Sequence, residues 1–441
     1  MHPLNNEQQN VKNAINSILP GERLVVSGRA GSGKTYAIAH SVADRKALFL
    51  APTHPARTVL EQELIDKRHE VMTIHSAIGW YQYRDADLNM VDNYLPAKEA
   101  KRRSERTNEK KTGLFSDVDI IIVDEFSMVG SFLFGAIEEY AREFDLPVVY
   151  SGDRFQLPPV KDREVIMDQG FKTITLNCSM RFPEDSEIFR LGEMLRNELE
   201  QRPNGELPCI EGNATVQVKP GMVWMNALIH GYAANENLLA VTSDNKTLHR
   251  LRQKVRQVGH DRLNAGDLVI SKQTDDLFRN GEQLTVSRIE SNTQSLEDVP
   301  GCVRRSRELS IQGFSVTFEE TDRIAFVLDD DRAVKNLEGR IHRLFEKGKL
   351  NHDEASRVLD WIDQVNSFEL SSLATVHKSQ GRSVDTVYID TGTVLRKPNW
   401  LSPLNHKRML YTAVTRARKQ VVFYEMLTYC EQAVTDLPLA A

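Results

Sequence analysis

The sequence predicts an α/β protein with two domains, each built on a parallel sheet, and with two inserts that interrupt the pattern. Short apolar, β-branched runs alternate with helical stretches through the first 175 residues, and a second set of such runs follows residue 236. Short apolar strands separated by helices are typical of a parallel sheet that is covered on both faces. The chain has 441 residues, enough for about three domains at ~150 residues each.

The first α/β region is expected to contain strands at residues 23–27, 47–51, 119–124 and 147–152. A glycine-rich turn follows the first of these strands, and the residues after it predict a helix from Lys34 to Ala43. The second region is expected to contain strands at residues 237–242, 386–390 and 420–424. Two α/β domains in tandem explain both sets of runs.

Two segments depart from this alternation. Residues 80 to about 117 begin with the aromatic side chains Trp80, Tyr81 and Tyr83 and then become polar and charged, which indicates an inserted arm. Residues 262 to about 375 indicate a small β-barrel-like insert with a helical hairpin attached, because a helical, charge-rich stretch follows several strand-like runs. Those runs are 267–270, 283–286, 314–318 and 324–328, and the helical stretch is 332–365.

The composition excludes several classes of protein. Hydrophobic residues make up 40% and charged residues 27%, which excludes a disordered or fibrous chain. No apolar run approaches the ~18 residues that cross a bilayer, and the first residues carry no secretory signal, so we expect a cytoplasmic protein. Cys178, Cys209, Cys302 and Cys430 form no Cys-x-x-Cys pair, which argues against a zinc site. The net charge of −6 does not exclude binding of nucleic acid in a local groove. Charges are screened over ~8–10 Å, so the local charge decides.

The strongest motif is a phosphate-binding loop. Residues 28–35 read Gly-Arg-Ala-Gly-Ser-Gly-Lys-Thr and fit the pattern G-x-x-x-x-G-K-[ST] between a strand and a helix. Glycine lacks the Cβ that would keep backbone N–H groups from closing around phosphates. Lys34 is expected to reach the β- and γ-phosphates, and the Thr35 hydroxyl to bind Mg²⁺. The alternative is a glycine-rich turn that caps a helix, and the strand–turn–helix order favours the phosphate loop.

Three further motifs suggest ATP hydrolysis. Asp124 and Glu125 end an apolar strand, where ligands of open parallel sheets collect; Asp124 is expected to hold Mg²⁺ through water, and Glu125 to deprotonate the attacking water. Gln156 is expected to sense the γ-phosphate, and Arg416 to act as an arginine finger from the second α/β domain. The alternatives are an acidic loop pair, a simple turn and a surface arginine.

Taken in order, these segments resemble those of superfamily 1 helicases, and within them the RecD/Dda branch, which moves 5′→3′. Residues 4–8 resemble the Gln motif, residues 51–56 and 73–76 the strand-contacting motifs, and residues 124–128 and 152–160 the hydrolysis and coupling motifs. Leu176 followed by Arg181 resembles motif IV, residues 375–381 motif V, and residues 411–418 motif VI. Arg252 departs from the family pattern, which commonly has Asn there.

The resemblance implies specific site residues and a Mg²⁺ ion bound with ATP. The ATP site would comprise Gln8, Gly28, Ala30, Gly31, Ser32, Gly33, Lys34, Thr35, Arg181, Gly381 and Arg416. The catalytic residues would be Lys34, Glu125, Gln156 and Arg416, with Thr35 and Asp124 as metal ligands. The contacts to single-stranded DNA would come from Pro52, Thr53, His54, Thr73, His75, Thr375 and His377.

The resemblance also implies two RecA-like P-loop domains in tandem with two inserts. Motor domain 1A would span 1–79 and 118–177, the inserted pin 1B 80–117, motor domain 2A 178–261 and 376–441, and an SH3-like domain 2B with a helical tower 262–375. The start of the 2B segment keeps only part of the family pattern. Trp80, Tyr81 and Tyr83 would stack on the end of the duplex or pack at the base of the arm.

The expected function is an ATP-dependent DNA helicase that moves 5′→3′ on single-stranded DNA and separates the duplex with the pin. The expected partners are ATP, single-stranded DNA, forked duplex and single-strand-binding or replication proteins, and no membrane is expected. We expect a monomer that serves replication, recombination or repair. The resemblance implies the cytoplasm of a bacterium or of a phage-infected cell. The enzyme alternatives are a translocase of opposite polarity, one that moves on RNA, and a small-molecule P-loop kinase. The alternative that is not an enzyme is a non-catalytic fork loader or scaffold. The carboxylate expected to act in hydrolysis argues against it, because a scaffold needs none.

Overall fold

The computed structural model describes most of the chain and divides it into two units. The described residues are 3–42, 44–64, 68–107, 114–160, 162–178, 180, 186–208, 210, 212–258, 262–272, 277–295, 310–328, 331–365, 368–394 and 401–424. The first unit comprises residues 1–80, 94–248 and 374–441, and the second comprises 81–93 and 249–373. Cys209, Cys302 and Cys430 lie outside the described residues. No helix in the described ranges is long and apolar enough to cross a membrane.

The first unit contains a six-stranded sheet with the order β3-β2-β6-β7-β1-β8, in which every neighbouring pair is parallel. The strands are β1 (Arg23–Gly28), β2 (Ala47–Ala51), β3 (Glu70–Thr73), β6 (Ile120–Val123), β7 (Val148–Gly152) and β8 (Lys172–Leu176). The helices around it are α1 (Asn6–Ser17), α2 (Lys34–Ser41), α3 (His54–Glu63), α4 (Ile74–Ala77), α5 (Ala97–Thr107) and α6 (Ser131–Glu143). The predicted α/β arrangement is therefore confirmed for this sheet.

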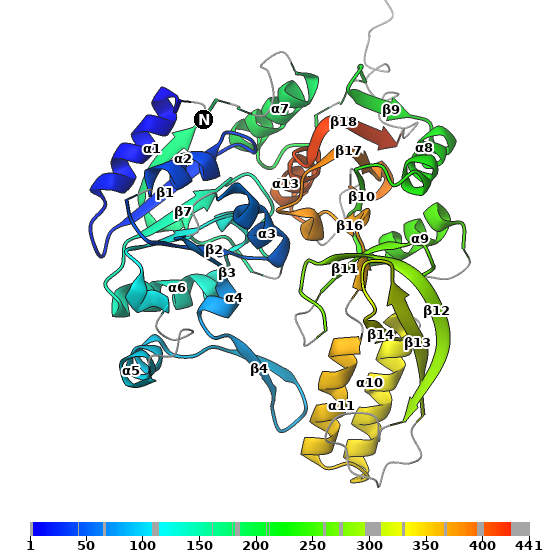
Figure 1. The fold of residues 1–441 in the computed structure, drawn as a ribbon. Coiled ribbons are helices and arrows are strands. Elements are labelled where there is room, and N and C mark those ends of the chain that lie inside the picture. The colour runs from blue at the N-terminus through cyan, green and yellow to red at the C-terminus, as the bar shows by residue number, and fades with distance from the viewer. Residues whose placement is uncertain are drawn as a thin grey trace, which may run out of the picture. The chain divides into compact units, whose positions relative to one another are not determined.

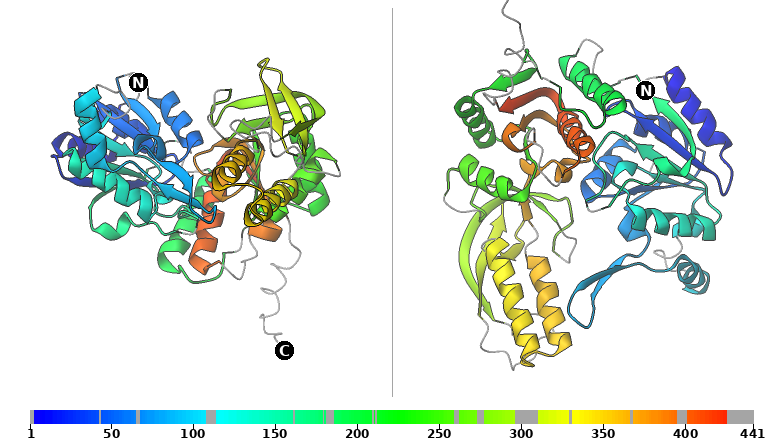
Figure 2. Two further views of the ribbon diagram at one scale, coloured as in Figure 1. Left: turned by 90° about the horizontal axis from the view of Figure 1, so that it is seen from below. Right: turned by 180° about the vertical axis from the view of Figure 1, so that it is seen from behind.

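Both faces of the first sheet are covered, because alternate residues of a strand point to opposite sides. Val26 and Phe49 pack with α1, α2 and α3 in one apolar cluster, whereas Val25 and Leu50 pack with α6 in another. Figures 1 and 2 show these helices on the two sides of the sheet. The parallel arrangement brings the carboxyl ends of β1, β2, β6 and β7 to one edge, where the loops that follow these strands can form a site.

The first unit also contains a second sheet, with five strands in the order β16-β10-β17-β18-β9. The strands are β9 (Val216–Lys219), β10 (Leu238–Thr242), β16 (Leu373–Thr375), β17 (Val384–Ile389) and β18 (Ala417–Tyr424). Three pairs, β10 with β17, β17 with β18 and β18 with β9, are parallel. The accompanying helices are α7 (Glu187–Gln201), α8 (Gly221–Ala233), α12 (Thr391–Val394) and α13 (Pro403–Val414). One apolar cluster joins α7 and α13 to β10, β17 and β18, so both helices belong to this sheet.

The second unit is built on an antiparallel sheet with the order β14-β13-β12-β11-β15. The strands are β11 (Leu268–Ser271), β12 (Gln283–Ser295), β13 (Ser310–Phe318), β14 (Ile324–Val327) and β15 (Phe368–Leu370). Helices α10 (Asp331–Glu346) and α11 (His352–Val365) form the expected helical hairpin, and they lie side by side in Figure 1. Strand β12 continues well beyond residue 286, where the apolar run ends, because the backbone of its later residues pairs with β13 as far as Ser295.

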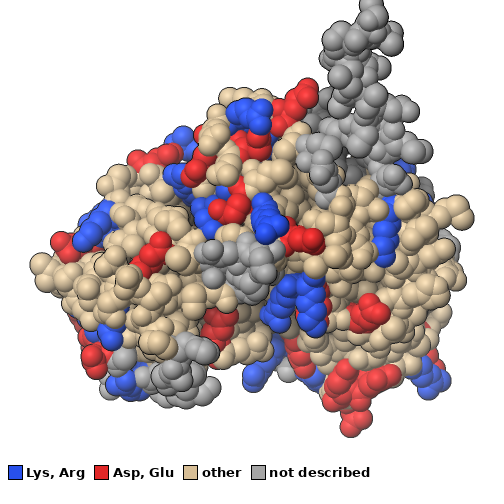
Figure 3. All heavy atoms as spheres, turned by 90° about the horizontal axis from the view of Figure 1, so that it is seen from above, with Lys and Arg blue, Asp and Glu red and all other residues tan. Residues whose placement is uncertain are grey.

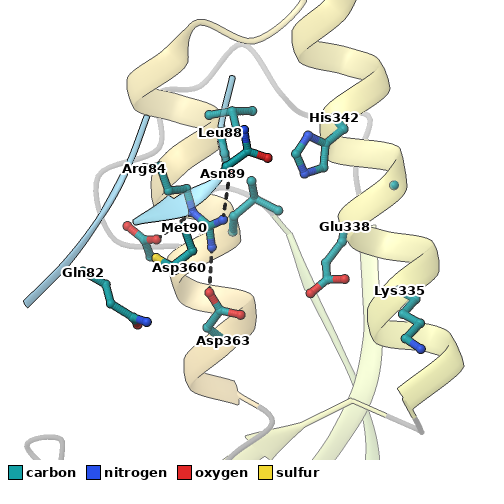
Figure 4. Close-up of a pocket in the computed structure, with 12 residues that line it drawn as sticks. Gln82, Arg84, Leu88, Asn89, Met90, Lys335, Glu338, His342, Asp360 and Asp363 are labelled. Carbon is teal, nitrogen blue, oxygen red and sulfur yellow. Dashed lines mark hydrogen bonds and ion pairs between the residues drawn. The ribbon is translucent and has the colours of Figure 1, made fainter. Parts of the chain in front are cut away.

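The same unit contains a hairpin of β4 (Tyr81–Arg84) and β5 (Met90–Asn93), which packs on α10 and α11. Arg84 pairs with Asp360 at 2.9 Å and with Asp363 at 2.6 Å, and Leu88 is buried in the apolar cluster of the two helices. Figure 4 shows these contacts beside a cavity of about 1040 Å³ that the hairpin and both helices line. The hairpin is therefore held by ion pairs and by one buried apolar side chain.

The rest of the predicted arm belongs to the first unit. Helix α5 packs on α6, with Ala97 and Ala100 buried in the core of the first sheet. Its Lys101 donates to the carbonyl oxygen of Glu143, while Arg102 is exposed. Residues 108–113 lie outside the described residues. The charged side of α5 is thus exposed to solvent, whereas its apolar side packs on α6.

Candidate active site

The phosphate loop runs from the end of β1 to the start of α2, as predicted. Gly33 precedes the helix with φ of 75°, in the left-handed region, and a Cβ there would lie 2.6 Å from Nε2 of Gln8. A Cβ on Gly28 would lie 2.8 Å from Oγ of Ser32. Glycine is therefore required at both positions for the loop to close. The Lys34 ammonium donates to the carbonyl oxygens of Gly28 at 2.9 Å and Arg29 at 3.0 Å, so it lies folded against the loop.

The acidic pair follows β6. Burial, and next the neighbouring Glu125 carboxylate, raise the pKa of Asp124, while the Lys34 ammonium acts in the opposite direction. A carboxylate in this environment gains most from a bound cation, which removes the electrostatic penalty of its charge. Glu125 has φ of 51°, which is unusual for a residue with a side chain and typical of strained functional positions.

Gln156 and Arg416 reach the same place from other elements. Gln156 is only 2% exposed, and its Oε1 atom has no hydrogen-bond partner among the described residues. Arg416 is 3% exposed and donates to the carbonyl oxygens of Thr412 at 3.1 Å and Arg382 at 3.4 Å. Burial lowers the pKa of Arg416, and the Glu125 carboxylate partly opposes this. The arginine is buried and oriented, in contrast to the surface arginine that was the alternative.

One cavity brings most of the predicted ATP-site residues together. Its volume of about 470 Å³ is within the usual range for a ligand pocket. The predicted residues that line it are Ala30, Gly31, Gly33, Lys34, Thr35, Asp124, Glu125, Gln156, Gly381 and Arg416. The lining residues that sequence reasoning missed are Tyr36, Ala39, His40, Val59, Glu63, Met180 and Ser383. The rings of Tyr36 and His40 pack against each other with centroids 4.0 Å apart and planes tilted by 39°, and their i,i+4 spacing behind the phosphate loop was the available signal.

Four of the predicted ATP-site residues do not line the cavity or cannot be placed. Gln8 is buried beneath the loop, where its side-chain Nε2 lies 3.5 Å from the carbonyl oxygen of Ser32 and its Oε1 accepts from the backbone of Asn5. Gly28 and Ser32 shape the loop without lining the cavity. Arg181 lies outside the described residues.

Oxygen ligands suit Mg²⁺, and two candidates line the cavity. Thr35 offers a hydroxyl at the start of α2, and Asp124 a carboxylate at the end of β6. Mg²⁺ commonly binds through one or two protein oxygens plus water and the oxygens of a nucleotide. These two residues therefore fit the group that the phosphate loop implies.

The predicted DNA contacts lie where strands end. Thr53 caps α3 by accepting from the backbone N–H of Ala56, and Thr73 caps α4 by accepting from that of Ser76. These capping roles stabilise the two helices whether or not DNA binds. Thr375 ends β16, Pro52 is buried after β2, and both lie at the carboxyl end of a strand.

The histidines of the same surface are partly buried. Burial, and next the charges of Arg57 and His75, lower the pKa of His54 to about 4. Burial also lowers the pKa of His377. The His75 ring packs edge-on against Trp80 with centroids 5.0 Å apart, so Trp80 packs at the base of the arm. The rings of His54 and His377 are therefore expected to be neutral at pH 7, where they can donate or accept hydrogen bonds but carry no charge.

A buried network joins the coupling loop after β7 to the second sheet. Arg196 of α7 contacts Asp153 Oδ1 at 3.2 Å and the Tyr411 hydroxyl at 3.2 Å. The Leu157 N–H donates to Thr412 Oγ1 at 3.0 Å, and Gln380 donates to the Leu157 carbonyl oxygen at 2.9 Å. The loop that carries Gln156 is therefore hydrogen-bonded to residues of both 375–381 and 411–418, the segments that resemble motifs V and VI.

Comparison with known proteins supports this organisation. The family model described as an AAA domain matches residues 3–205, and that of the UvrD-like helicase C-terminal domain matches residues 370–424. An uncharacterized protein, R530, of Acanthamoeba polyphaga mimivirus is 22% identical over 90% of this chain and 94% of its own length. An ATP-dependent DNA helicase, Pif1, of Psychrobacter sp. (strain PRwf-1) is 23% identical over 86% of this chain and 63% of its own length.

A solved structure that concerns DNA unwinding at forked double-stranded DNA by two coordinating Pif1 helicases shares the fold. It is 18% identical, covers 97% of this chain and 93% of the other, and has a TM-score of 0.50. The fold class of tandem RecA-like α/β domains is thus confirmed. The two family models match in this order and the predicted ATP-site residues line one cavity, so the chain is similar to the superfamily 1B helicases of the Pif1 and RecD group.

Proposed function

We propose that this ATP-hydrolysing DNA helicase moves 5′→3′ on single-stranded DNA and separates the duplex with the β4–β5 hairpin. The observation that carries the proposal is the shared cavity, in which the phosphate loop of the first sheet meets Arg416 of the second. A nucleotide bound there would contact both sheets at once. Its binding and hydrolysis can therefore change how the two sheets are held, as a motor requires.

The chemistry follows from the residues of the cavity. Backbone N–H groups of the loop and Lys34 would hold the phosphates, and Glu125 would orient and deprotonate the attacking water. Gln156 would contact the γ-phosphate, and Arg416 would stabilise the charge that develops during transfer. A Mg²⁺ ion bound with ATP at Thr35 and Asp124 would neutralise part of the phosphate charge.

Coupling to DNA would run through the strand ends. Pro52, Thr53, His54, Thr73 and His75 would contact the single strand from the first sheet. Thr375 and His377 would contact it from the second. Contacts of this kind go mainly to phosphates and base faces, so we propose a motor with little sequence preference.

Strand separation is assigned to the hairpin because of its exposed aromatic residues and its support. Tyr81 and Tyr83 are 48% and 45% exposed, with ring centroids 6.3 Å apart. The Arg84 ion pairs hold the hairpin on α11. A supported hairpin with two aromatic rings suits stacking on the last base pair of a duplex, worth ~1–3 kcal/mol per base.

The proposal includes the organisation set out above, with motor domains 1A and 2A, a pin, and an SH3-like domain 2B that carries the tower. Lys and Arg alternate with Asp and Glu on the face in Figure 3, so that face suggests no broad electrostatic attraction to DNA. We propose a cytoplasmic monomer that acts on forked DNA together with single-strand-binding or replication proteins.

Unwinding of tailed duplexes tests the polarity and the substrate. Duplexes with a 5′ tail, a 3′ tail or no tail, made of DNA or RNA, would be incubated with ATP and Mg²⁺. We expect strand separation of the 5′-tailed DNA alone. Faster separation of the 3′-tailed duplex would reverse the proposed polarity, and faster separation of the RNA duplex would change the proposed substrate.

A further inference from the structure

An ion pair connects the phosphate loop to helix α7. Arg29 is the second residue of the loop, and its Nη2 atom lies 2.8 Å from Oε2 of Glu193. The two side chains are 15% and 30% exposed. The Arg29 guanidinium also lies over the Phe189 ring, 5.2 Å from its centroid. Phe189 and Glu193 are four positions apart on α7, so one face of the helix holds the arginine.

Helix α7 belongs to the second sheet and not to the first. Its Leu191 and Leu195 are buried in the apolar cluster that contains Val241 and Ile389, and the helix packs on α13 and β18. The Arg29–Glu193 pair therefore connects the phosphate loop to the opposite domain. Arg29 occupies a variable position of the phosphate-loop pattern, so the motif itself assigns it no role.

The same helix holds a second nucleotide-facing segment. Arg196, three positions after Glu193, contacts Asp153 in the loop that carries Gln156. Helix α7 thus contacts the two segments of the first sheet that would surround the γ-phosphate. Both contacts are ionic, and the Arg196 pair is almost fully buried, so the helix is rigidly attached at that end.

The attachment at Arg29 can respond to the nucleotide. In the structure the Lys34 ammonium donates to the Arg29 carbonyl oxygen at 3.0 Å. A phosphate in the loop competes for the same ammonium, because Lys34 is the residue expected to bind it. Occupancy of the loop therefore alters the hydrogen bonding of the residue whose side chain pairs with Glu193.

We propose that Arg29 and Glu193 are positioning residues that transmit occupancy of the phosphate loop to α7 and so to the second motor domain. This inference rests on the proposed function. Glu193 lies outside the set of residues that line the cavity, so its side chain acts through Arg29 and not on the nucleotide.

A double-mutant cycle tests the proposal, because it isolates the energy of one pair. The variants are Glu193→Gln, Arg29→Gln, their combination, and the charge reversal Arg29→Glu with Glu193→Arg. The control is Asp385→Asn, which removes the Lys419 ion pair within the second sheet. Each protein would be assayed for ATP affinity without DNA, for DNA-stimulated turnover, and for base pairs separated per ATP consumed. Thermal unfolding confirms that each variant is folded.

We expect Glu193→Gln to lower DNA-stimulated turnover about fivefold, the effect of a pair worth ~1 kcal/mol, and to lower the base pairs separated per ATP. ATP affinity should change less than about twofold in this variant. The double variant should be no worse than the worse single variant, and the charge reversal should recover at least part of the loss. The control should match wild type.

Three outcomes overturn the proposal. The first is a double variant in which the losses of turnover of the two single variants multiply. The second is a control that loses as much DNA-stimulated turnover as Glu193→Gln. The third is a Glu193→Gln variant that is less stable but still separates the wild-type number of base pairs per ATP. Failure of the proposed function looks different, because wild type itself would then show no DNA-stimulated turnover.

Discussion

The Tyr411 hydroxyl donates a 2.6 Å hydrogen bond to Oδ2 of Asp153, from a residue 258 positions away in the chain. Both residues are almost fully buried, and Arg196 completes the network. Burial, and next the Asp153 carboxylate, raise the pKa of Tyr411 well above its usual value, so the hydroxyl stays protonated and donates. The network joins the coupling loop of the first sheet to α13 of the second.

Tyr411→Phe should therefore destabilise the protein. The substitution keeps the ring but removes the donor, and a hydrogen bond to a charged group contributes ~1.5–3 kcal/mol. Urea unfolding should show a loss of about this size. Tyr424→Phe is a suitable control, because Tyr424 is the last residue of β18 in the second sheet and is only partly buried. Equal unfolding free energies for Tyr411→Phe and wild type would show that the hydrogen bond contributes nothing measurable.

Lys34→Ala should lose ATP turnover while the fold stays intact. Lys34 is expected to hold the transferring phosphate, and removal of one such group commonly slows reaction by ~10²–10³. Turnover and the circular-dichroism melting curve would be measured together, with the exposed Lys98→Ala as control. Normal turnover in Lys34→Ala would refute the phosphate-loop assignment.

Much of this site was predictable from the sequence because its signals are local. Strands β1, β2, β6, β7, β10 and β17 are buried along their length or nearly so, and they read as apolar runs. The phosphate loop is a continuous motif. The acidic pair directly follows a strand, so its place at the carboxyl edge follows from topology.

The elements that were missed carry weaker signals. Edge strand β8 exposes Lys172 and Thr173, and edge strand β9 has four residues with only Val216 buried, so neither forms an apolar run. Pairings between distant segments, such as Arg29 with Glu193, have no local signature. The cavity residue Glu63 lies at the end of α3, and only the folded chain shows that it approaches the loop.

The hairpin should be needed for strand separation but not for ATP turnover. Helix α5 is part of the first core, so the informative deletion removes only residues 82–92 and not the whole predicted arm. The milder variant Tyr81→Ala with Tyr83→Ala keeps the Arg84 ion pairs. Met90→Ala, on the partner strand, is the control.

We expect both hairpin variants to keep most DNA-stimulated turnover and to lose most duplex unwinding on 5′-tailed substrates. Each stacked base contributes ~1–3 kcal/mol, so the tyrosine variant alone should slow unwinding at least about fivefold. Full unwinding after removal of residues 82–92 would show that another element separates the strands.

The depressed pKa of His54 predicts how stability depends on pH. The unfolded histidine takes up a proton near pH 6.5, whereas the folded one does so only near pH 4. The unfolded state therefore binds more protons in this interval, and the unfolding free energy should fall as the pH drops from 6.5 to 4. His377 contributes in the same direction.

His54→Gln should make this pH dependence shallower in urea unfolding between pH 7.5 and 5. A His230→Gln variant, at an exposed position of α8, serves as the matched histidine control. Because His54 is neutral at pH 7, His54→Gln should leave the salt dependence of single-stranded DNA binding unchanged. An identical pH slope in His54→Gln and wild type would mean that the folded ring titrates normally.

The most direct test is ATP turnover of wild type and Arg416→Ala across a titration of single-stranded DNA. The account predicts that wild-type turnover rises with DNA and saturates. It predicts that Arg416→Ala loses ~10³-fold or more in turnover while still binding ATP, since the arginine acts on the charge of the transition state. Wild-type turnover that ignores DNA, or an Arg416→Ala variant that hydrolyses ATP at the wild-type rate, would contradict the claim that groups from both sheets cut one nucleotide.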